Sequence, residues 1–353
     1  MNNSLNIKTT LVFLGIIAVL AIALSTALLS RDIFPEKYFY DSTTIDSAKN
    51  SSSSLKIGDS YNNTAFFYKS LGLSEKSTTN KTLFPAIYII AIALILRKLK
   101  TGNATGILLI AAYSSISAAV YLSQYSKESI VLLLSLSFLL LNGSKKGIIL
   151  WLLLAIGYAI YFRLYWIITI CLFISNLIIL SKTRRFSLAI SAIFILYIIL
   201  AILFPIVYGQ EIGQHRLSAN EDRIGSMDAE TLITPLIPGD GPVLDTINTF
   251  IQLITFLFPT PLAITGKVLH FLSFAAISSI SIITIKNLRK QIKSDSFSRS
   301  LKLQSSYSLA LAIVAVQAIF EPDYGSYVKH LTPTLPILLF LLNYHDKRTH
   351  HKK

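Results

Sequence analysis

The stretch FSLAISAIFILYIILAILFPIVY, residues 186–208, contains no charged residue and is the clearest indication of the fold class. An apolar run of about 20 residues can cross the hydrocarbon core of a bilayer as a helix. Similar blocks recur along the chain, so that 53% of its residues are hydrophobic and only 14% are charged. Soluble domains carry about 25% charged residues. The sequence therefore excludes a soluble or disordered chain and predicts an all-α polytopic integral membrane protein.

Further apolar blocks divide the rest of the chain into predicted spans. They cover residues 10–30, 83–96, 104–122, 129–142, 147–162, 164–181, 246–264, 266–285, 305–321 and 331–344. Pro259 and Pro261 interrupt the block 246–264, and prolines break helices, so we interpret it as a re-entrant or interfacial hairpin. The remaining blocks predict about ten transmembrane helices in a single membrane domain, residues 1–353, with two long outer loops at 31–82 and 209–245.

The distribution of charge predicts the orientation. Most of the 32 basic residues lie in short loops or termini on one side, and that side faces the cytoplasm by the positive-inside rule, together with both chain ends. Of the 18 acidic residues, only Asp295 and Asp346 lie on that side. The net charge of +14 is spread over the ends of apolar blocks, so we interpret it as a topology signal and expect no nucleic acid partner.

Several kinds of chemistry lack their sequence patterns. Cys171 is the one cysteine, and the six histidines are not placed at helical ligand spacing within a span. The chain contains no phosphate-binding loop and no zinc-protease motif. We therefore expect no metal and no cofactor.

Six cations lie at the outer ends of apolar blocks, against the positive-inside trend: Lys127, Arg163, Arg216, Arg223, Lys267 and Lys329. Ionisable residues in such places are functional candidates, and arginine suits bidentate binding of phosphate. We expect Arg163, Arg216, Arg223, Lys127 and Lys329 to bind an anionic headgroup. The alternative is local pairing, as of Lys127 with Glu128 or of Arg223 with Asp222.

Arg163 is the most specific of these candidates, because aromatic residues flank it in the sequence and the surrounding stretch contains no other charge. Tyr161, Tyr165 and Trp166 would form platforms for a sugar or a lipid beside a phosphate clamp. The alternative is an aromatic belt with a snorkelling arginine.

Two segments hold candidate general bases. Residues 321–330 place Asp323 and His330 between the last two blocks, and either side chain could accept a proton from an acceptor hydroxyl. Glu221, in the second outer loop, is a further candidate. The alternative for residues 321–330 is a polar turn, since Pro322 and Gly325 are turn residues.

The chain resembles the Wzy-type oligosaccharide repeat-unit polymerases of bacterial O-antigen and capsule synthesis. The likeness lies in four short motifs: 34–42 (FPEKYFYDS), 126–128 (SKE), 161–166 (YFRLYW) and 323–330 (DYGSYVKH). The chain departs from the Arg-x10-Gly motif described for some members, because position 234 does not hold a glycine after Arg223.

The resemblance implies a metal-independent glycosyltransferase of the bacterial inner membrane. It would transfer a glycan from undecaprenyl pyrophosphate onto a lipid-linked repeat unit at the periplasmic face. Arg163, Arg216 and Arg223 would hold the pyrophosphate, and Asp323, His330 or Glu221 would activate the acceptor. A chain-length regulator and a flippase are candidate partners. The alternatives are a flippase for the same lipid-linked sugar, an O-antigen ligase, or a glycan O-acyltransferase that uses His270.

Overall fold

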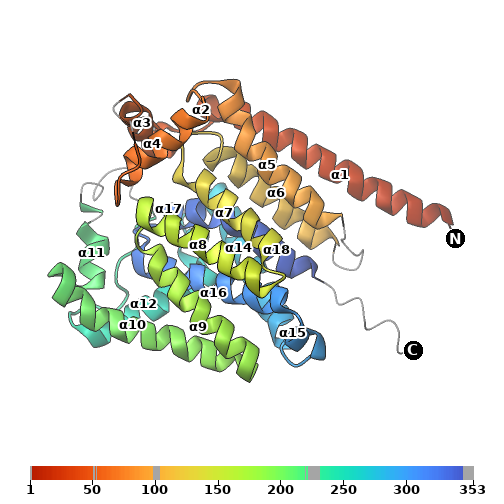
Figure 1. Cartoon of the computed structure of the whole chain (residues 1–353). Coiled ribbons are helices and arrows are strands. Elements are labelled where there is room, and N and C mark those ends of the chain that lie inside the picture. Colours follow the sequence, from red (N-terminus) through yellow and green to blue (C-terminus); the bar gives the residue numbers. More distant parts are fainter. Residues whose placement is uncertain are drawn as a thin grey trace. The chain divides into compact units, whose positions relative to one another are not determined.

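Helix α10 (Phe186–Tyr208) occupies the same residues as the apolar block that decides the fold. It belongs to a computed structural model that describes residues 2–50, 52, 54–97, 104–218, 220–221 and 231–344 (Figure 1). The described residues form helices and no sheet, with one isolated bridge between Leu232 and Asp323. The predicted all-α class is confirmed.

The chain divides into two units, which are described separately. The first contains Met1–Phe138, Gly157–Leu164 and Thr332–Lys353, and the second contains Leu139–Ile156 and Tyr165–Leu331. In the first unit lie α1 (Asn2–Leu28), α2 (Ser30–Ile33), η1 (Glu36–Phe39), α3 (Tyr40–Ala48), α4 (Ser60–Ser70), α5 (Thr78–Leu96), α6 (Ala104–Tyr121), most of α7 (Lys127–Leu141), η4 (Thr332–Thr334) and α18 (Leu335–Asn343). In the second lie most of α8 (Lys145–Tyr161), α9 (Trp166–Thr183), α10, α11 (Ile212–Ser218), α12 (Pro242–Leu257), α13 (Thr260–Ala263), α14 (Val268–Gln291), α15 (Asp295–Arg299), α16 (Leu301–Phe320) and α17 (Tyr324–Leu331).

Five of these helices are long and apolar enough to cross a membrane, namely α5, α9, α10, α14 and α16. They indicate a multi-pass membrane protein. Their lengths of 18 to 24 residues match the roughly 20 residues that a spanning helix needs. The other expected spans coincide with further helices, namely α1, α6, α7, α8 and, after η4, α18.

Prolines interrupt two of the apolar blocks, and the first of these interruptions was expected. The block 246–264 is α12 followed by the short α13, with Pro259 and Pro261 at the break. The block 331–344 is not one helix, because η4 separates α17 from α18 in the sequence Thr332-Pro-Thr-Leu-Pro336. A proline lacks the N–H that would continue a helical hydrogen-bond ladder.

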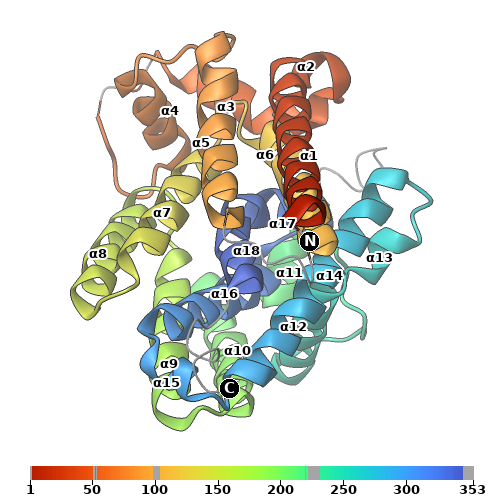
Figure 2. The ribbon, with the colours of Figure 1, turned by 90° about the vertical axis from the view of Figure 1, so that its right-hand side faces the viewer.

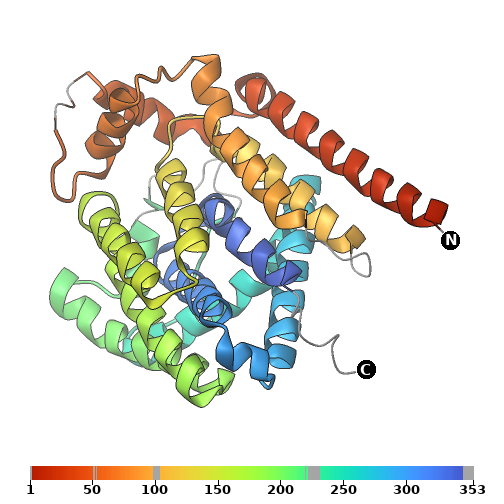
Figure 3. The same ribbon diagram turned by 45° about the vertical axis from the view of Figure 1, so that its right-hand side comes forward.

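In the first unit, α1 lies alongside α5 and α6 (Figures 1 and 3). Ala23 and Ala27 of α1 are fully buried and pack with Ile89 of α5 and Ala119 of α6. Small residues let helix backbones approach closely, which is how helices associate inside a bilayer.

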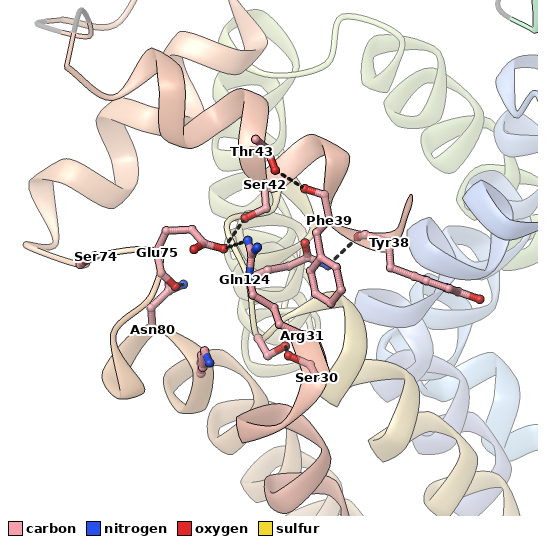
Figure 4. A network of polar contacts seen from close by, with 12 residues as sticks. Ser30, Arg31, Tyr38, Phe39, Ser42, Thr43, Ser74, Glu75, Asn80 and Gln124 are labelled. Atoms are coloured by element: carbon pink, nitrogen blue, oxygen red, sulfur yellow. Dashed lines mark hydrogen bonds and ion pairs between the residues drawn. The ribbon is translucent and has the colours of Figure 1, made fainter. Parts of the chain in front are cut away.

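Within residues 31–82, several polar contacts meet at one carboxylate. Glu75 is buried and accepts hydrogen bonds from Arg31 and from Ser42, the latter at 2.9 Å from its Oγ (Figure 4). The guanidinium of Arg31 also lies 4.9 Å from the ring centre of Phe39. This cluster joins α2, η1 and α3 to the segment before α5.

In the second unit, α16 lies among other helices. Fifteen of its twenty residues are buried, and it packs against α9 and α12, each of which also contacts α10 (Figure 2). The hydroxyl of Tyr197 on α10 donates to the carbonyl of Ala315 on α16 at 2.8 Å. The C-terminal end of α16 leads directly into the segment that holds Glu321, Asp323 and His330.

Candidate functional site

The turn between α16 and α17 holds a paired acid and base. Nδ1 of His330 lies 2.5 Å from Oε1 of Glu321, whose side chain is only 3% exposed, whereas that of His330 is 18% exposed. A carboxylate at Nδ1 favours the tautomer with the proton on that nitrogen, so Nε2 is left as the acceptor. The pair therefore presents a basic nitrogen oriented by a buried carboxylate, the usual arrangement of a general base.

Asp323, the other candidate base in this segment, caps α17. Its Oδ1 accepts from the backbone N–H of Ser326 and its Oδ2 accepts from the Ser326 hydroxyl, both at 2.8 Å. This is the bonding of an N-cap aspartate, which satisfies a backbone donor that the first helical turn leaves unpaired. Both carboxylate oxygens are thus engaged in holding the helix that carries His330.

A buried arginine lies against the same end of α16. Arg216 of α11 is 4% exposed and its Nη1 donates to the carbonyl of Ala318 at 3.3 Å. Burial lowers the pKa of Arg216, and the nearby Asp245, Tyr197 and Tyr324 oppose that shift. A guanidinium has five N–H donors. Among the described residues this one makes a single long hydrogen bond, so it can still bind an anion.

Hydrogen bonds attach α11 to α12 and attach the segments on either side of residues 222–230 to this turn. The two first-turn amides of Ile212 and Gly213 donate to Asp245 of α12 at 2.9 and 3.1 Å. The carbonyl of Pro322 accepts from the Asn220 amide at 2.9 Å and from the Ile233 N–H at 3.0 Å. Both described parts of the segment 209–245 are therefore attached to the turn between Glu321 and Asp323.

Aromatic rings gather beside this site in the second unit. Tyr165 stacks on Phe320 with ring centres 5.1 Å apart, and Phe204 lies 6.1 Å from Phe320 and 5.6 Å from His215. Burial lowers the pKa of His215, and the charge of Arg216 lowers it further. Trp166, the first residue of α9, is buried.

A second group of the predicted residues lies in the first unit. Arg163 donates from Nη2 to Oε1 of Glu128 at 2.6 Å, with side chains that are 10% and 1% exposed. Lys127 Nζ lies 3.5 Å from the ring centre of Tyr61, whose hydroxyl donates to Asp41 at 3.0 Å. Burial and the charge of Asp41 raise the pKa of Tyr61 to about 12. Tyr161 is half-buried and offers its backbone carbonyl to Asn63.

The predicted site residues therefore fall into two sets. Lys127, Tyr161 and Arg163 lie in the first unit. Tyr165, Trp166, Arg216, Asp323, Lys329 and His330 lie in the second. Glu221 is exposed in the second unit, and Arg223 lies outside the described residues. The structure pairs Glu128 with Arg163, 35 residues away, a partner that sequence adjacency does not predict.

Sequence reasoning missed the partners of its own candidates. The segment 321–330 drew attention to Asp323 and His330, whereas Glu321 is the group that orients His330. Asp245 was not singled out, although it holds α11 and faces Arg216. The sequence signal that could have identified Asp245 and Glu321 is a carboxylate next to an apolar stretch. A buried carboxylate needs a partner, so such a residue is expected to pair with a cation or a hydrogen-bond donor.

No protein-family model, curated protein or solved structure matches this chain. Among the described residues, no group of three or more His, Cys, Asp or Glu side chains could hold a metal ion. Function must therefore be argued from the two sets of residues themselves.

Proposed function

We propose that this chain is a membrane-embedded glycosyltransferase that polymerises lipid-linked repeat units of a bacterial surface glycan. The Glu321–His330 pair is the observation on which the proposal rests. The four sequence motifs shared with Wzy-type polymerases give the substrate class, a glycan on undecaprenyl pyrophosphate. The five long apolar helices are compatible with an enzyme whose substrates are anchored in a bilayer.

In the proposed reaction, His330 acts as the general base. Its Nε2 takes the proton from an acceptor sugar hydroxyl while that oxygen attacks the anomeric carbon of the donor glycan. The new bond is carbon–oxygen, and the bond from the anomeric carbon to the pyrophosphate oxygen breaks with its electron pair. Glu321 stabilises the imidazolium that forms, because its carboxylate accepts the Nδ1 hydrogen.

Arg216 is the proposed partner of the leaving pyrophosphate. Its charge is buried and within electrostatic reach of Asp245 rather than paired with it directly. A fixed cation in a site of low dielectric stabilises the negative charge that develops on a departing phosphate. Lys329 lies next to His330 on α17 and is half-buried, so it is the second candidate for this contact.

The proposal includes the topology expected from the charges. About ten spans in the bacterial inner membrane, with both termini in the cytoplasm, would place the turn 321–323 and α11 at the periplasmic face. That is the face where lipid-linked repeat units become available after they are flipped. A chain-length regulator and a flippase would be the protein partners.

The test is a gel of the surface glycan from the natural host. The gene is deleted and replaced by the wild type, by His330→Gln or by His270→Gln, with membrane levels checked by immunoblot. His270 is a matched control, because it is also part-buried and pairs through Nδ1 with a neutral hydroxyl, that of Thr265, at 2.9 Å. We expect the deletion and His330→Gln to leave core plus one repeat unit, and His270→Gln to keep the full ladder.

Other outcomes would redirect the proposal. A full ladder with His330→Gln at normal membrane levels would remove the base from the mechanism. Loss of the single-repeat band on deletion would favour the flippase or the ligase. An unchanged ladder on deletion would leave a glycan modifier, such as an O-acyltransferase.

A further inference from the structure

Helix α12 turns a polar stripe inward and apolar residues outward. Asp245, Thr249 and Gln252 are 6%, 0% and 5% exposed, whereas Val243 and Ile254 are 71% and 47% exposed. Positions 245, 249, 252 and 256 follow helical spacing and so share one face. Polar groups that face the interior of a membrane protein are costly and mark pathways or binding sites.

Not every polar group on this face is used by the fold. Asp245 accepts from two amides of α11, and Asn248 exchanges hydrogen bonds with the backbone of Ile237. The hydroxyl of Thr249 and the amide nitrogen of Gln252, however, have no hydrogen-bond partner among the described residues. Buried polar atoms nearly always have a hydrogen-bond partner, so the lack of one at Thr249 and Gln252 requires an explanation.

The two groups lie on a stripe with the proposed catalytic elements at either end. At one end, Asp245 contacts α11, the helix of Arg216. At the other end, the ring of Phe256 stacks on Tyr327 of α17, with centres 3.9 Å apart, and lies 5.7 Å from that of Tyr324. Thr249 and Gln252 therefore sit between the helix that carries Arg216 and the helix that carries His330.

The neighbouring helix contributes a group of the same kind. Gln317 of α16 is 5% exposed, and its Oε1 also has no partner among the described residues. It lies one turn before Glu321, whose backbone N–H donates to the Gln317 carbonyl at 2.9 Å. α12 and α16 pack against each other in the second unit.

The chemistry of these groups fits a sugar. A hydroxyl and two amides offer neutral donors and acceptors, as sugar hydroxyl and acetamido groups require. Binding sites of this kind place a few polar groups among apolar and aromatic side chains, here Phe256 and Tyr324. Thr249, Gln252 and Gln317 carry no negative charge, whereas sites for divalent cations in proteins usually include carboxylates.

We propose that Thr249, Gln252 and Gln317 form the subsite for the sugar residue attached to the pyrophosphate that Arg216 binds. The subsite rests on the proposed function, because it assumes a glycan with its phosphate at Arg216. The subsite recognises the first sugar. The hydroxyls of that sugar hydrogen-bond to the polar groups of Thr249, Gln252 and Gln317 that have no partner among the described residues. A sugar without these hydroxyls binds less tightly.

The test uses the full-length protein in liposomes with the host's own lipid-linked repeat unit, extracted from the deletion strain. Thr249→Val and Gln252→Leu are compared with Thr246→Val. Thr246 is a matched control, because it is buried on the same helix but its hydroxyl bonds to the carbonyl of Pro242 at 2.7 Å. Equilibrium binding and the initial rate of polymer formation are measured at increasing substrate, together with the melting temperature.

We expect each subsite variant to raise the dissociation constant and the half-saturating substrate concentration about fivefold to tenfold. The melting temperature should stay the same or rise, since an apolar isostere removes a buried unpaired group. Thr246→Val should leave binding unchanged. Unchanged binding in both subsite variants would overturn the subsite. If binding is unchanged and the melting temperature falls, Thr249 and Gln252 hold structural water instead. Weaker binding in the variants, with no polymer formed even by the wild type, would keep the subsite and reject the polymerase.

Discussion

Among single residues, Arg163 has two possible roles that stability and activity can separate. Its ion pair with Glu128 is largely buried. Removing one partner of a buried pair leaves an uncompensated charge and costs about 3 kcal/mol. Arg163→Ala should therefore lower the melting temperature in detergent, and the double variant Arg163→Ala with Glu128→Gln should recover most of the loss.

The double variant also tests phosphate binding by Arg163. If it is stable and still yields a full glycan ladder, the arginine serves the fold and not the pyrophosphate. A stable double variant without a ladder would support the clamp expected from the sequence. A double variant no more stable than Arg163→Ala would contradict the energetic coupling of the pair.

His215 makes the stability of the second unit depend on pH. Burial first, and then the charge of Arg216, lower its pKa below the ordinary value of about 6.5. The unfolded chain therefore binds this proton more readily than the folded one. The stabilisation is complete above pH 6.5 and is lost as the pH falls through that value toward the lower pKa of the folded protein.

The measurement is the melting temperature between pH 7.5 and 5, for the wild type and for His215→Gln. We expect the wild type to lose stability faster than the variant as the pH falls. Gln210 lies 2.9 Å from Nδ1 of His215, and protonation of that nitrogen would also disturb this contact. Equal slopes for the two proteins would show that His215 is not the titrating group.

Among the elements, α17 depends on its cap. Asp323→Ala removes the acceptor for the Ser326 N–H and should cost about 1 kcal/mol, whereas Asp323→Asn keeps a good N-cap side chain. We expect Asp323→Asn to retain both the melting temperature and the glycan ladder. A stable Asp323→Asn protein with no ladder would restore Asp323 as the base and displace His330.

For the whole molecule, the topology depends on whether α12 and α13 cross the membrane. α12 has 16 residues and is not among the five long apolar helices. We expect its two flanks to lie on the same outer side. In a Cys171→Ala background, single cysteines at Asp240 and at Thr265 should both react with an impermeant maleimide added to cells, and one at Ser298 should not. Reaction at only one of the first two positions would show that the segment crosses.

The sequence predicted the bounds of long apolar helices more closely than the points at which prolines interrupt a helix. The block 186–208 is α10 and the block 104–122 is α6 to within one residue, because long charge-free runs have no other way to satisfy their backbone in a bilayer. Within the block 331–344 the sequence did not predict the change of helix type, in which Pro333 and Pro336 accompany a 3-10 turn, η4, before α18.

By itself, the sequence determined the helical class, the presence of spans and the residue types of the candidate site. These are local properties: hydrophobicity and backbone hydrogen bonding act within about 20 consecutive residues. The pairing of charged side chains depended on the tertiary structure. Glu128 bonds Arg163, 35 residues away, and Glu321 orients His330, nine residues away. Such pairs form because a buried charge must find an opposite partner wherever packing brings one within reach, at a sequence separation that no local pattern encodes.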